Sequence, residues 1–404
     1  MAATSSGAGA ADEQSKGWAK TSLACSRSAE SELDIGAANS AGALVAAALA
    51  LPGVMPATAA AEVAPDQAVV EFKYFDYRDW QPGADRMRVI SPGLYLLKPL
   101  SGSLAIEGTL VYDSMSGASP LFFNTLSGAS GEGVKDYRTA GDVRLTKYYD
   151  RVAVGLGAAM STEQDFFSRA VSLDVRRASD DRNRTYAFGV ARTWDRIDPT
   201  NFAVENEKRR TVDFLLGVTQ ALSTNSIVQS NVTYSTGRGY YDDPYKPGDT
   251  RPDSRRVFAW LTRVNQYLPA FDATLKFSYR LLRDSFGSVA NALEVAWHQP
   301  LPEGWSVMPS LRYYTQSAAD FYFDPPFPRG FVLGRSYTAD TRLAAFGAFT
   351  PGIAVAKTLP DGWSVNLKLE YYRQDPDWRL GGSGSPGIQT FSARWIQAGF
   401  SKTF

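Results

Sequence analysis

The sequence has very few of the side chains that most often build metal and catalytic sites. Its 404 residues include one cysteine, Cys25, and one histidine, His298. Cys25 lies in the leader described below, so the rest of the chain has no thiol for a disulfide, a nucleophile or a metal ligand. One imidazole without a nearby cysteine or carboxylate cluster completes neither a zinc site nor a haem site. We therefore expect no metal, no cofactor and no enzymatic activity. A hydrolase that depends on His298 is disfavoured. His298 falls on the same strand face as the charged Glu294, and we expect that face to point inward, away from lipid.

Long apolar runs are also scarce, and the mean hydropathy is −0.24. Helical spanning needs about 20 consecutive apolar residues. The one comparable stretch is residues 41–61, AGALVAAALALPGVMPATAAA. Its short apolar centre, Pro-Gly break and run of small residues are typical of a cleavable signal peptide. We expect residues 1–61 to be a leader with its apolar part at 41–61, and residues 62–404 to form a single domain. The acidic residues before position 41 are unusual for a signal peptide and suggest that the true start codon lies further downstream.

The chain has no excess of either charge. Lysine and arginine number 42, as do aspartate and glutamate, and the two signs are interleaved along the sequence. Nucleic-acid binding requires a basic stripe or patch. We therefore expect no nucleic-acid partner.

Aromatic residues are plentiful, at 13% of the chain, and they recur in alternation with polar residues. The last stretch, residues 390–404, is the clearest case. Steps of two back from Phe404 reach Phe400 and Ile396, while small or polar residues fill most intervening positions. Such an ending is typical of the closing strand of a bacterial outer-membrane barrel. Lys402 also falls on the lipid-facing set, so we expect its ammonium group to reach the periplasmic headgroups.

Similar alternating segments follow one another from residue 69 onward. We count about sixteen, separated by connections that alternate between short and long. The pattern predicts an all-β fold: a transmembrane antiparallel up-and-down β-barrel of about 16 strands, preceded by the cleavable signal peptide. Residues 69–77 should pair with the last strand and close the sheet. A soluble sandwich or propeller would also give many short strands, but it explains neither the signal peptide nor the terminal Phe404.

Charged residues occupy the strand set opposite the apolar one. A charge that faces lipid at mid-depth costs about 2 to 4 kcal/mol, so these residues should line the lumen. The lumen-lining candidates are Glu71, Lys73, Glu107, Asp213, Arg263, Lys276, Arg280, Glu294, Arg312, Lys368 and Glu370. Two interpretations stay open: a water-filled pore, or a salt-bridged network that fills a narrow interior.

Residues 318–337, AADFYFDPPFPRGFVLGRSY, are unusually aromatic for a loop. Phe321, Phe323, Phe327 and Phe331 would be poorly solvated in an exposed segment. This loop is a candidate constriction in the barrel mouth or a docking surface, and packing against neighbouring loops is the simpler alternative.

A second polar loop contains Asp242, Asp243 and Asp249. Their carboxylates suit a divalent cation. The EF-hand spacing is absent, however, and Arg251, Arg255 and Arg256 follow closely. We expect these arginines to neutralise the acids.

Several motifs resemble a bacterial family catalogued as domain of unknown function 3570. They are DSMSGASP at 113–120, STEQDFFSRAVSLD at 161–174, DRNRT at 181–185, DDPYK at 242–246, LRYYTQSAADFY at 311–322 and ADTRLAAFGAFT at 339–350. The resemblance implies an outer-membrane location but no mechanism. The resemblance also implies that the gene lies beside genes for small lipoproteins and for flavin-transfer or redox maturation proteins. Such neighbours imply a helper role in an envelope electron-transfer or metal-related system.

The leading hypothesis is an outer-membrane pore or passage for a small solute with a mixed-charge lumen. The alternative is a non-conducting scaffold that docks a periplasmic lipoprotein or a redox partner. Outer-membrane lipid and the barrel-assembly machinery are the other expected partners.

Overall fold

The computed structural model describes residues 63–117, 134–246, 248–324, 332 and 334–404. The predicted leader, including Cys25, and the loop residues Phe327 and Phe331 lie outside the described residues. Within that part of the chain, no helix is long and apolar enough to cross a membrane.

Strands make up most of the described chain. Their bounds are β1 Val69–Gln81, β2 Ala84–Ser101, β3 Leu104–Gly117, β4 Val134–Tyr148, β5 Val152–Thr162, β6 Phe166–Ala178, β7 Arg184–Ile197, β8 Glu207–Ser223, β9 Ser226–Gly239, β10 Ser254–Leu268, β11 Ala273–Asp284, β12 Val289–Pro300, β13 Trp305–Gln316, β14 Phe346–Thr358, β15 Trp363–Asp375 and β16 Phe391–Thr403. Short 3-10 helices lie at η3 Pro269–Phe271, η4 Pro302–Gly304, η5 Thr341–Leu343, η6 Pro360–Gly362 and η7 Pro376–Trp378.

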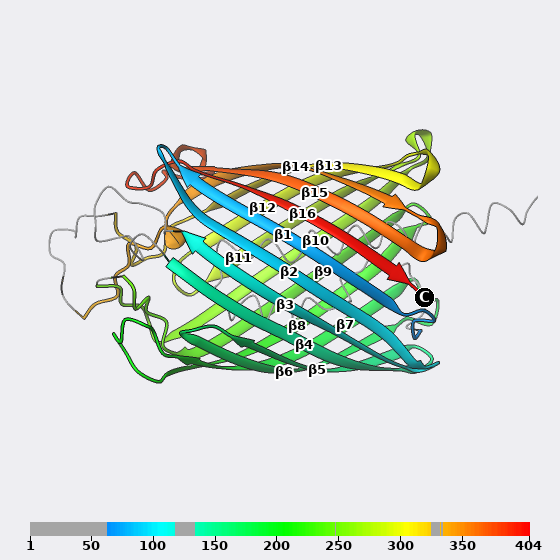
Figure 1. Ribbon diagram of the computed structural model, residues 1–404, viewed down its shortest axis with the longest axis horizontal. Coiled ribbons are helices and arrows are strands. Elements are labelled where there is room, and N and C mark those ends of the chain that lie inside the picture. Colours follow the sequence, from blue (N-terminus) through cyan, green and yellow to red (C-terminus); the bar gives the residue numbers. More distant parts are fainter. Residues whose placement is uncertain (1–62, 118–133, 247, 325–331, 333) are drawn as a thin grey trace, which may run out of the picture.

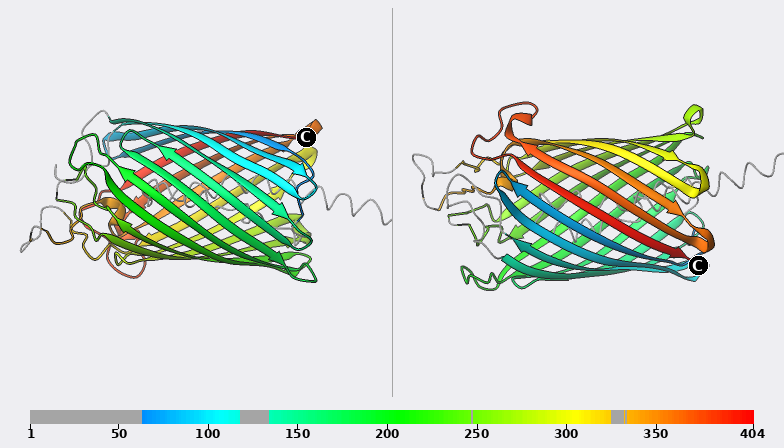
Figure 2. Two further views of the ribbon diagram at one scale, coloured as in Figure 1. Left: turned by 90° about the horizontal axis from the view of Figure 1, so that it is seen from below. Right: turned by 45° about the horizontal axis from the view of Figure 1, so that its top comes forward.

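The sixteen strands of the described chain close into one antiparallel barrel, seen from three sides in Figures 1 and 2. Each strand pairs with its neighbours in sequence, and β1 pairs with β16 from Val69 opposite Thr403 to Trp80 opposite Ser392. The predicted fold class, strand count and closure are therefore confirmed. Closure leaves no unpaired sheet edge in lipid, which is the condition for a β structure to span a membrane.

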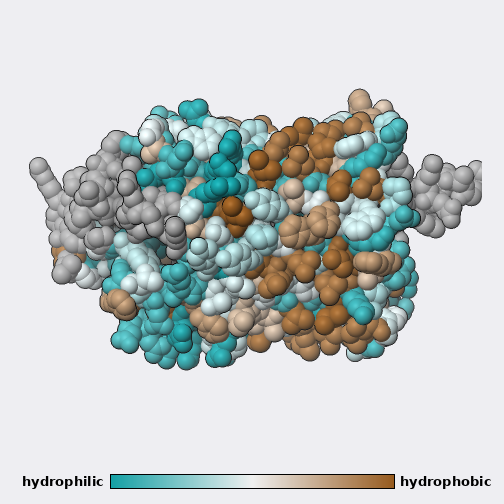
Figure 3. Space-filling model, viewed as in Figure 1, coloured by the Kyte–Doolittle hydropathy of each residue, from teal (hydrophilic) through white to brown (hydrophobic). Residues whose placement is uncertain are grey.

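The two faces of the barrel wall differ in chemistry. Outward positions carry exposed apolar side chains such as Leu216, Leu367 and Phe400. Inward positions carry small and charged side chains such as Ala153, Asp174 and Lys368, which are buried. On the face seen in Figure 3, apolar residues gather over the half nearer the C-terminus, and hydrophilic residues cover the other half.

The two ends of the barrel also differ. Val69, Thr403 and the short turns that follow even-numbered strands lie at one end, called the terminal end below. In bacterial barrels this end faces the periplasm. The long connections, such as 240–253 and 317–345, lie at the opposite loop end (Figure 1). The predicted alternation is not strict, because 82–83, 163–165 and 285–288 are also short connections at the loop end.

The closing strand has the predicted faces. Ile396, Phe400 and Phe404 are exposed on the outward side, and the Phe400 ring lies 5.4 Å from that of Phe72 on β1. The ammonium group of Lys402 lies 5.2 Å from the centre of the Trp363 ring, at the terminal end of the barrel.

One strand begins later than the sequence predicts. The alternation by which we count the sixteen segments extends over 339–358 and predicts one strand there, but β14 begins at Phe346. Residues 339–345 belong to the preceding loop, where the Asp340 side chain accepts a hydrogen bond from the backbone N–H of Arg342 and caps η5.

Candidate functional site

Inward-facing charges form a network on the wall made by β3, β4 and β6. Arg144 of β4 lies 3.8 Å from Glu107 of β3 and also contacts Asp174 of β6. It reaches Asp174 by crossing β5 at Gly155, where a side chain would collide with both partners. The network therefore depends on a glycine in the intervening strand.

A second network repeats this arrangement on β12, β13 and β15. Arg312 of β13 lies 2.7 Å from Glu294 of β12 and 3.6 Å from Glu370 of β15. It crosses β14 near Gly352, whose added Cβ would lie 2.8 Å from Cγ of Glu370. Lys368 and the indole N–H of Trp395 also contact Glu370. These ion pairs join residues on adjacent strands, or on strands with a single strand between them, so they run along the wall.

The strand register places all eleven lumen-lining candidates on the inward set. Seven of them belong to the two networks or to the pair Lys73–Glu71, whose charged atoms lie 3.5 Å apart: Glu71, Lys73, Glu107, Glu294, Arg312, Lys368 and Glu370. Glu107 contacts Arg144. Asp213 is buried on β8, while Arg263, Lys276 and Arg280 stand on the neighbouring strands β10 and β11. The structure thus gathers most of the set into wall networks, with a basic group on β10 and β11.

Two long loops pair with each other at the loop end. The backbone N–H of Thr250 donates to the carbonyl of Tyr337 at 2.8 Å, and the N–H of Tyr337 donates back at 2.7 Å. We call residues 240–246, 248–253, 317–324 and 334–345 the loop cap.

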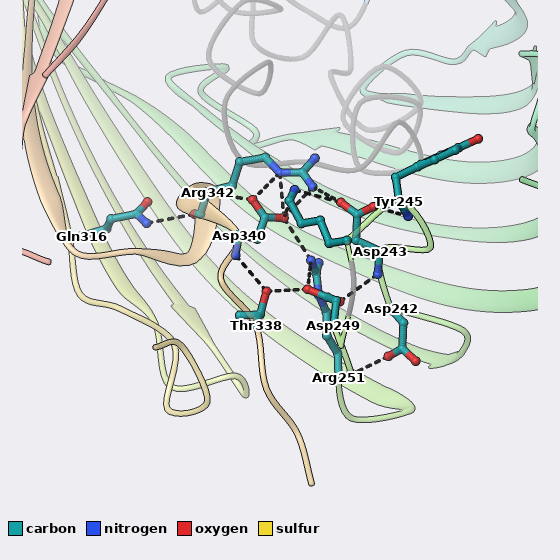
Figure 4. A network of polar contacts seen from close by, with 10 residues as sticks. Asp242, Asp243, Tyr245, Asp249, Arg251, Gln316, Thr338, Asp340 and Arg342 are labelled. Carbon is teal, nitrogen blue, oxygen red and sulfur yellow. Dashed lines mark hydrogen bonds and ion pairs between the residues drawn. The ribbon is translucent and has the colours of Figure 1, made fainter. Parts of the chain in front are cut away.

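Asp340 is the centre of the polar part of the loop cap (Figure 4). It is 1% exposed. Its carboxylate lies 2.9 Å from a terminal nitrogen of Arg251 and 3.4 Å from Nζ of Lys246, and Nε of Arg342 donates to it at 2.9 Å. Asp243 lies 2.9 Å from Arg342 and 3.0 Å from Lys246. One carboxylate therefore ties together cations from two loops.

Electrostatics favour this closed arrangement at neutral pH. Burial alone would raise the pKa of Asp340, but Arg342, Lys246 and Arg251 outweigh it and hold the pKa well below its usual range. Asp340 raises the pKa of the Arg342 guanidinium in return. Asp340 is therefore ionised, and its three cations keep it so.

Apolar side chains of the loop cap form a buried cluster together with three residues from outside it, Phe286, Phe346 and Ile388. Its members are Tyr241, Phe286, Ala319, Phe321, Tyr322, Leu343, Ala344, Phe346 and Ile388. The Phe321 ring is 8% exposed and packs edge-on against Phe286 at 5.1 Å. Phe323 is 39% exposed and stacks on Tyr337 at 5.9 Å. Phe321 thus packs against neighbouring loops, the simpler of the alternatives that the sequence left open.

Inward side chains of the barrel anchor the loop cap to the mouth. Gln316 of β13 donates from Nε2 to the carbonyls of Arg342 at 3.0 Å and Ala344 at 2.6 Å. Arg209 of β8 lies 5.2 Å from the centre of the Tyr241 ring. Because these anchors point into the barrel, the loop cap sits in its mouth.

The acidic loop residues have partly different partners from those predicted. Asp249 forms a bidentate pair with Arg251 at 2.7 and 2.9 Å, as the sequence suggested. Asp243 instead pairs with Lys246 and Arg342. Arg255 contacts Asp284, and Arg256 is exposed on the outward set of β10. The predicted neutralisation by Arg255 and Arg256 is therefore wrong. The sequence could not show Arg342 as a partner, since it lies 99 residues from Asp243.

A further acidic group brings together Asp136, Glu163 and Asp165, whose oxygens lie within 4.8 Å of one another. Burial raises the pKa of Glu163 to about 7, opposed by Arg138 and reinforced by Asp136 and Asp165. Asp165 also accepts a hydrogen bond from the Tyr245 hydroxyl at 2.6 Å. Sequence analysis missed this group because Asp136 reaches it only through strand pairing.

His298 lies on the inward set of β12, opposite Thr274, and is buried. Its placement agrees with the expected face. The prediction that the protein lacks a histidine-dependent activity stays a prediction.

Comparisons with known proteins agree with this architecture. The family model described as "Protein of unknown function (DUF3570)" matches residues 41–395. A bacterial polysaccharide outer membrane secretin superposes with a TM-score of 0.51 at 8% identity, over 83% of this chain and 98% of that one. The siderophore receptor PirA from Pseudomonas aeruginosa gives a TM-score of 0.42 at 9% identity, over 84% and 80% of the two chains. OccAB1 from Acinetobacter baumannii gives 0.43 at 11% identity, over 86% and 99%. No curated protein matches significantly. At 8% identity the likeness to the secretin concerns the fold alone, and the fold is that of a bacterial outer-membrane barrel.

Proposed function

We propose that this chain, which belongs to the DUF3570 family, is an outer-membrane passage for a small hydrophilic solute, closed at its outer mouth by the loop cap. Membership of the family gives no activity, so the proposal rests on the barrel itself. We propose no catalytic role for His298.

The proposal rests on the observation that the inward ion pairs connect nearby strands of one wall. Arg144 and Arg312 pair with acids on the same wall, no more than two strands away. A network that filled a narrow interior would instead bridge opposite walls. A barrel of about sixteen strands leaves an aqueous channel when its centre is not occupied by side chains. Pairing along the wall neutralises the lining and leaves the centre to water and solute.

The loop cap supplies the closed state. Its ion pairs join three acids, Asp243, Asp249 and Asp340, to three bases, Lys246, Arg251 and Arg342. Leaving a buried charge such as Asp340 without its partners costs about 3 to 5 kcal/mol. Opening the mouth therefore requires a compensating interaction, such as a solute or partner that replaces those contacts.

Planar-bilayer recording of the refolded protein tests the passage. We expect discrete conductance steps that are infrequent at neutral pH, because the loop cap is closed most of the time. Heat-modifiable migration in electrophoresis would verify the folded barrel before recording. A folded preparation that gives no steps at any voltage would contradict the proposal.

The second candidate is a non-conducting scaffold that docks a periplasmic lipoprotein or redox partner. The observation that favours it is the same loop cap, since a mouth held by a buried carboxylate and a packed aromatic cluster suits a barrel that never opens. Under this alternative, planar-bilayer recording shows no conductance steps, and purification from native membranes recovers a stoichiometric periplasmic partner. Recovery of the barrel alone, with conductance steps, would contradict it.

A further inference from the structure

Basic side chains gather on one part of the outer wall, near the loop end. They belong to the outward sets of six consecutive strands, β6 to β11, and all are exposed. We call this group the basic belt: Arg169, Arg192, Arg196, Lys208, Arg210, Arg238, Arg256 and Arg283.

The register lines up members of the belt across the strands. Arg169 on β6 stands opposite Trp194 on β7, Trp194 opposite Arg210 on β8, and Arg210 opposite Arg238 on β9. The guanidinium carbons of Arg169 and Arg192 lie 5.9 and 5.1 Å from the centre of the Trp194 ring. On β6 to β9 the belt is therefore a row of cations around an indole ring.

The belt borders the apolar band that faces lipid. Successive outward residues are two apart along a strand, and the next outward residue toward the terminal end is apolar in most of the belt strands. These neighbours are Val171, Val190, Val212, Phe258 and Leu281. The cations therefore lie where the hydrocarbon ends and the lipid headgroups of the outer leaflet begin.

The protein itself supplies almost no counter-charge. In the described strands β6 to β11 the outward positions include no acid, since Asp174, Asp195, Asp213 and Asp284 are all inward and buried. Arg196 pairs with the loop residue Asp198 at 2.9 Å. No ion pair within the described residues involves the other seven cations of the belt.

The same level of the wall is different on other strands. There the outward positions carry Tyr112 on β3, Tyr137 on β4, Tyr313 on β13 and Phe349 on β14. Aromatic residues are the ordinary choice at a membrane interface. Exposed outward cations also occur near the loop end of β1, β2, β15 and β16, at Arg78, Arg88, Arg373 and Arg394, but Arg78 and Arg88 pair with Asp76 on β1. The basic belt is thus the larger of the two groups, and its own strands supply no outward acid.

We propose that the basic belt is a binding site for the phosphate groups of the glycolipid that forms the outer leaflet of bacterial outer membranes. Guanidinium groups bind phosphate through paired, charge-assisted hydrogen bonds, and several aligned cations engage a bisphosphorylated headgroup together. Acyl chains of the same lipid would lie against the apolar band directly below. The belt therefore selects lipopolysaccharide over a lipid without headgroup phosphate.

Native mass spectrometry of the full chain in detergent, titrated with bisphosphorylated lipid A, tests this site. The informative variant is the triple change Arg169→Gln, Arg192→Gln and Arg210→Gln. We expect it to weaken lipid A binding at least tenfold, because three charged contacts to phosphate are lost. The matched control is Arg373→Gln with Arg394→Gln, two outward cations near the loop end of β15 and β16 on the opposite wall, which should change binding less than twofold.

A second arm varies the lipid and leaves the protein unchanged. Wild-type protein should bind dephosphorylated lipid A at least tenfold more weakly than the bisphosphorylated form. Equal binding of the two lipids, or an equal loss in the triple variant and the control variant, would overturn the site. Since this arm needs no variant, the test holds even if the triple variant folds poorly.

Discussion

Arg144 and Asp174 pair across a strand that separates them, and Gly155 of that strand leaves the space they use. A methyl group on Gly155 would lie 2.7 Å from Nε of Arg144. Gly155→Ala should therefore push the ion pair apart and lower the free energy of unfolding by about 2 kcal/mol, a typical cost for disturbing a buried charge network. Denaturant unfolding in micelles, followed by tryptophan fluorescence, measures the change.

Gly93→Ala is the matched control. An added Cβ at Gly93 would meet its nearest neighbour at 3.5 Å, an ordinary contact distance. We expect a change below about 0.5 kcal/mol. Equal destabilisation by the two variants would show that Gly155 has no special role in the network.

Asp340→Asn should open the loop cap. The change removes the one carboxylate that contacts Lys246, Arg251 and Arg342, and it leaves these cations close together. We expect a loss of about 3 kcal/mol in the stability of the closed loops and a much larger fraction of time in the conducting state. Single-channel recording at pH 7 measures that fraction, with Asp253→Asn, an exposed loop acid, as the control.

The effect of Asp340→Asn should depend on pH. The folded pKa of Asp340 is depressed, so its contribution is fully present above the unfolded pKa of about 4 and is lost as pH falls through the folded value. Wild type and variant should therefore differ by the same amount from pH 7 down to about pH 5 and converge only in strong acid. Convergence already near pH 6 would contradict this assignment.

Glu163 should give the opposite pH dependence. Burial, with the nearby acids, raises its folded pKa to about 7, above the unfolded value of about 4.3. The folded state then holds the proton more tightly, so stability falls as pH rises from about 4 to 7. Glu163→Gln should remove this slope and stabilise the barrel at pH 8, as measured by melting temperature at pH 5 and pH 8. The exposed Glu205→Gln should leave the slope unchanged.

Phe321 and Phe323 form a matched pair of aromatic truncations. Phe321 lies in the buried cluster, whereas Phe323 is 39% exposed. Phe321→Ala should destabilise the loop cap by about 3 kcal/mol and speed hydrogen exchange in residues 317–324. Phe323→Ala should have less than half that effect. A larger effect at Phe323 would mean that Tyr337 stacking, rather than the cluster, holds the loop.

The sequence was sufficient to predict the barrel because alternate residues of a strand point to opposite faces, so the apolar and polar sets can be read from the sequence. Alternation placed Phe400 and Phe404 outward and Glu370 inward, and an even strand count required β1 to meet β16. These inferences need only local pattern and the rule that a membrane sheet has no free edge.

The loop cap could not be predicted in this way. Asp249 and Thr338 form a side-chain hydrogen bond across 89 residues, and no periodicity links two loops. The alternation around Phe346 even extended a predicted strand into the segment that holds Asp340. Non-local contacts between irregular segments depend on tertiary packing, which a single sequence does not display.

The most direct test of a passage closed by the loop cap is a reversible cross-link within it. Thr250 and Tyr337 exchange backbone hydrogen bonds, and Cα atoms in such pairs lie about 5.5 Å apart, within disulfide range. In a Cys25→Ser background, Thr250→Cys with Tyr337→Cys would be recorded before and after reduction. Ser223→Cys with Ser226→Cys, at a turn on the terminal end, controls for oxidation. We predict that the oxidised cap variant carries at least tenfold less current than the reduced one, while the control is unaffected. Equal current in both states, with the disulfide verified by mass, would contradict the account.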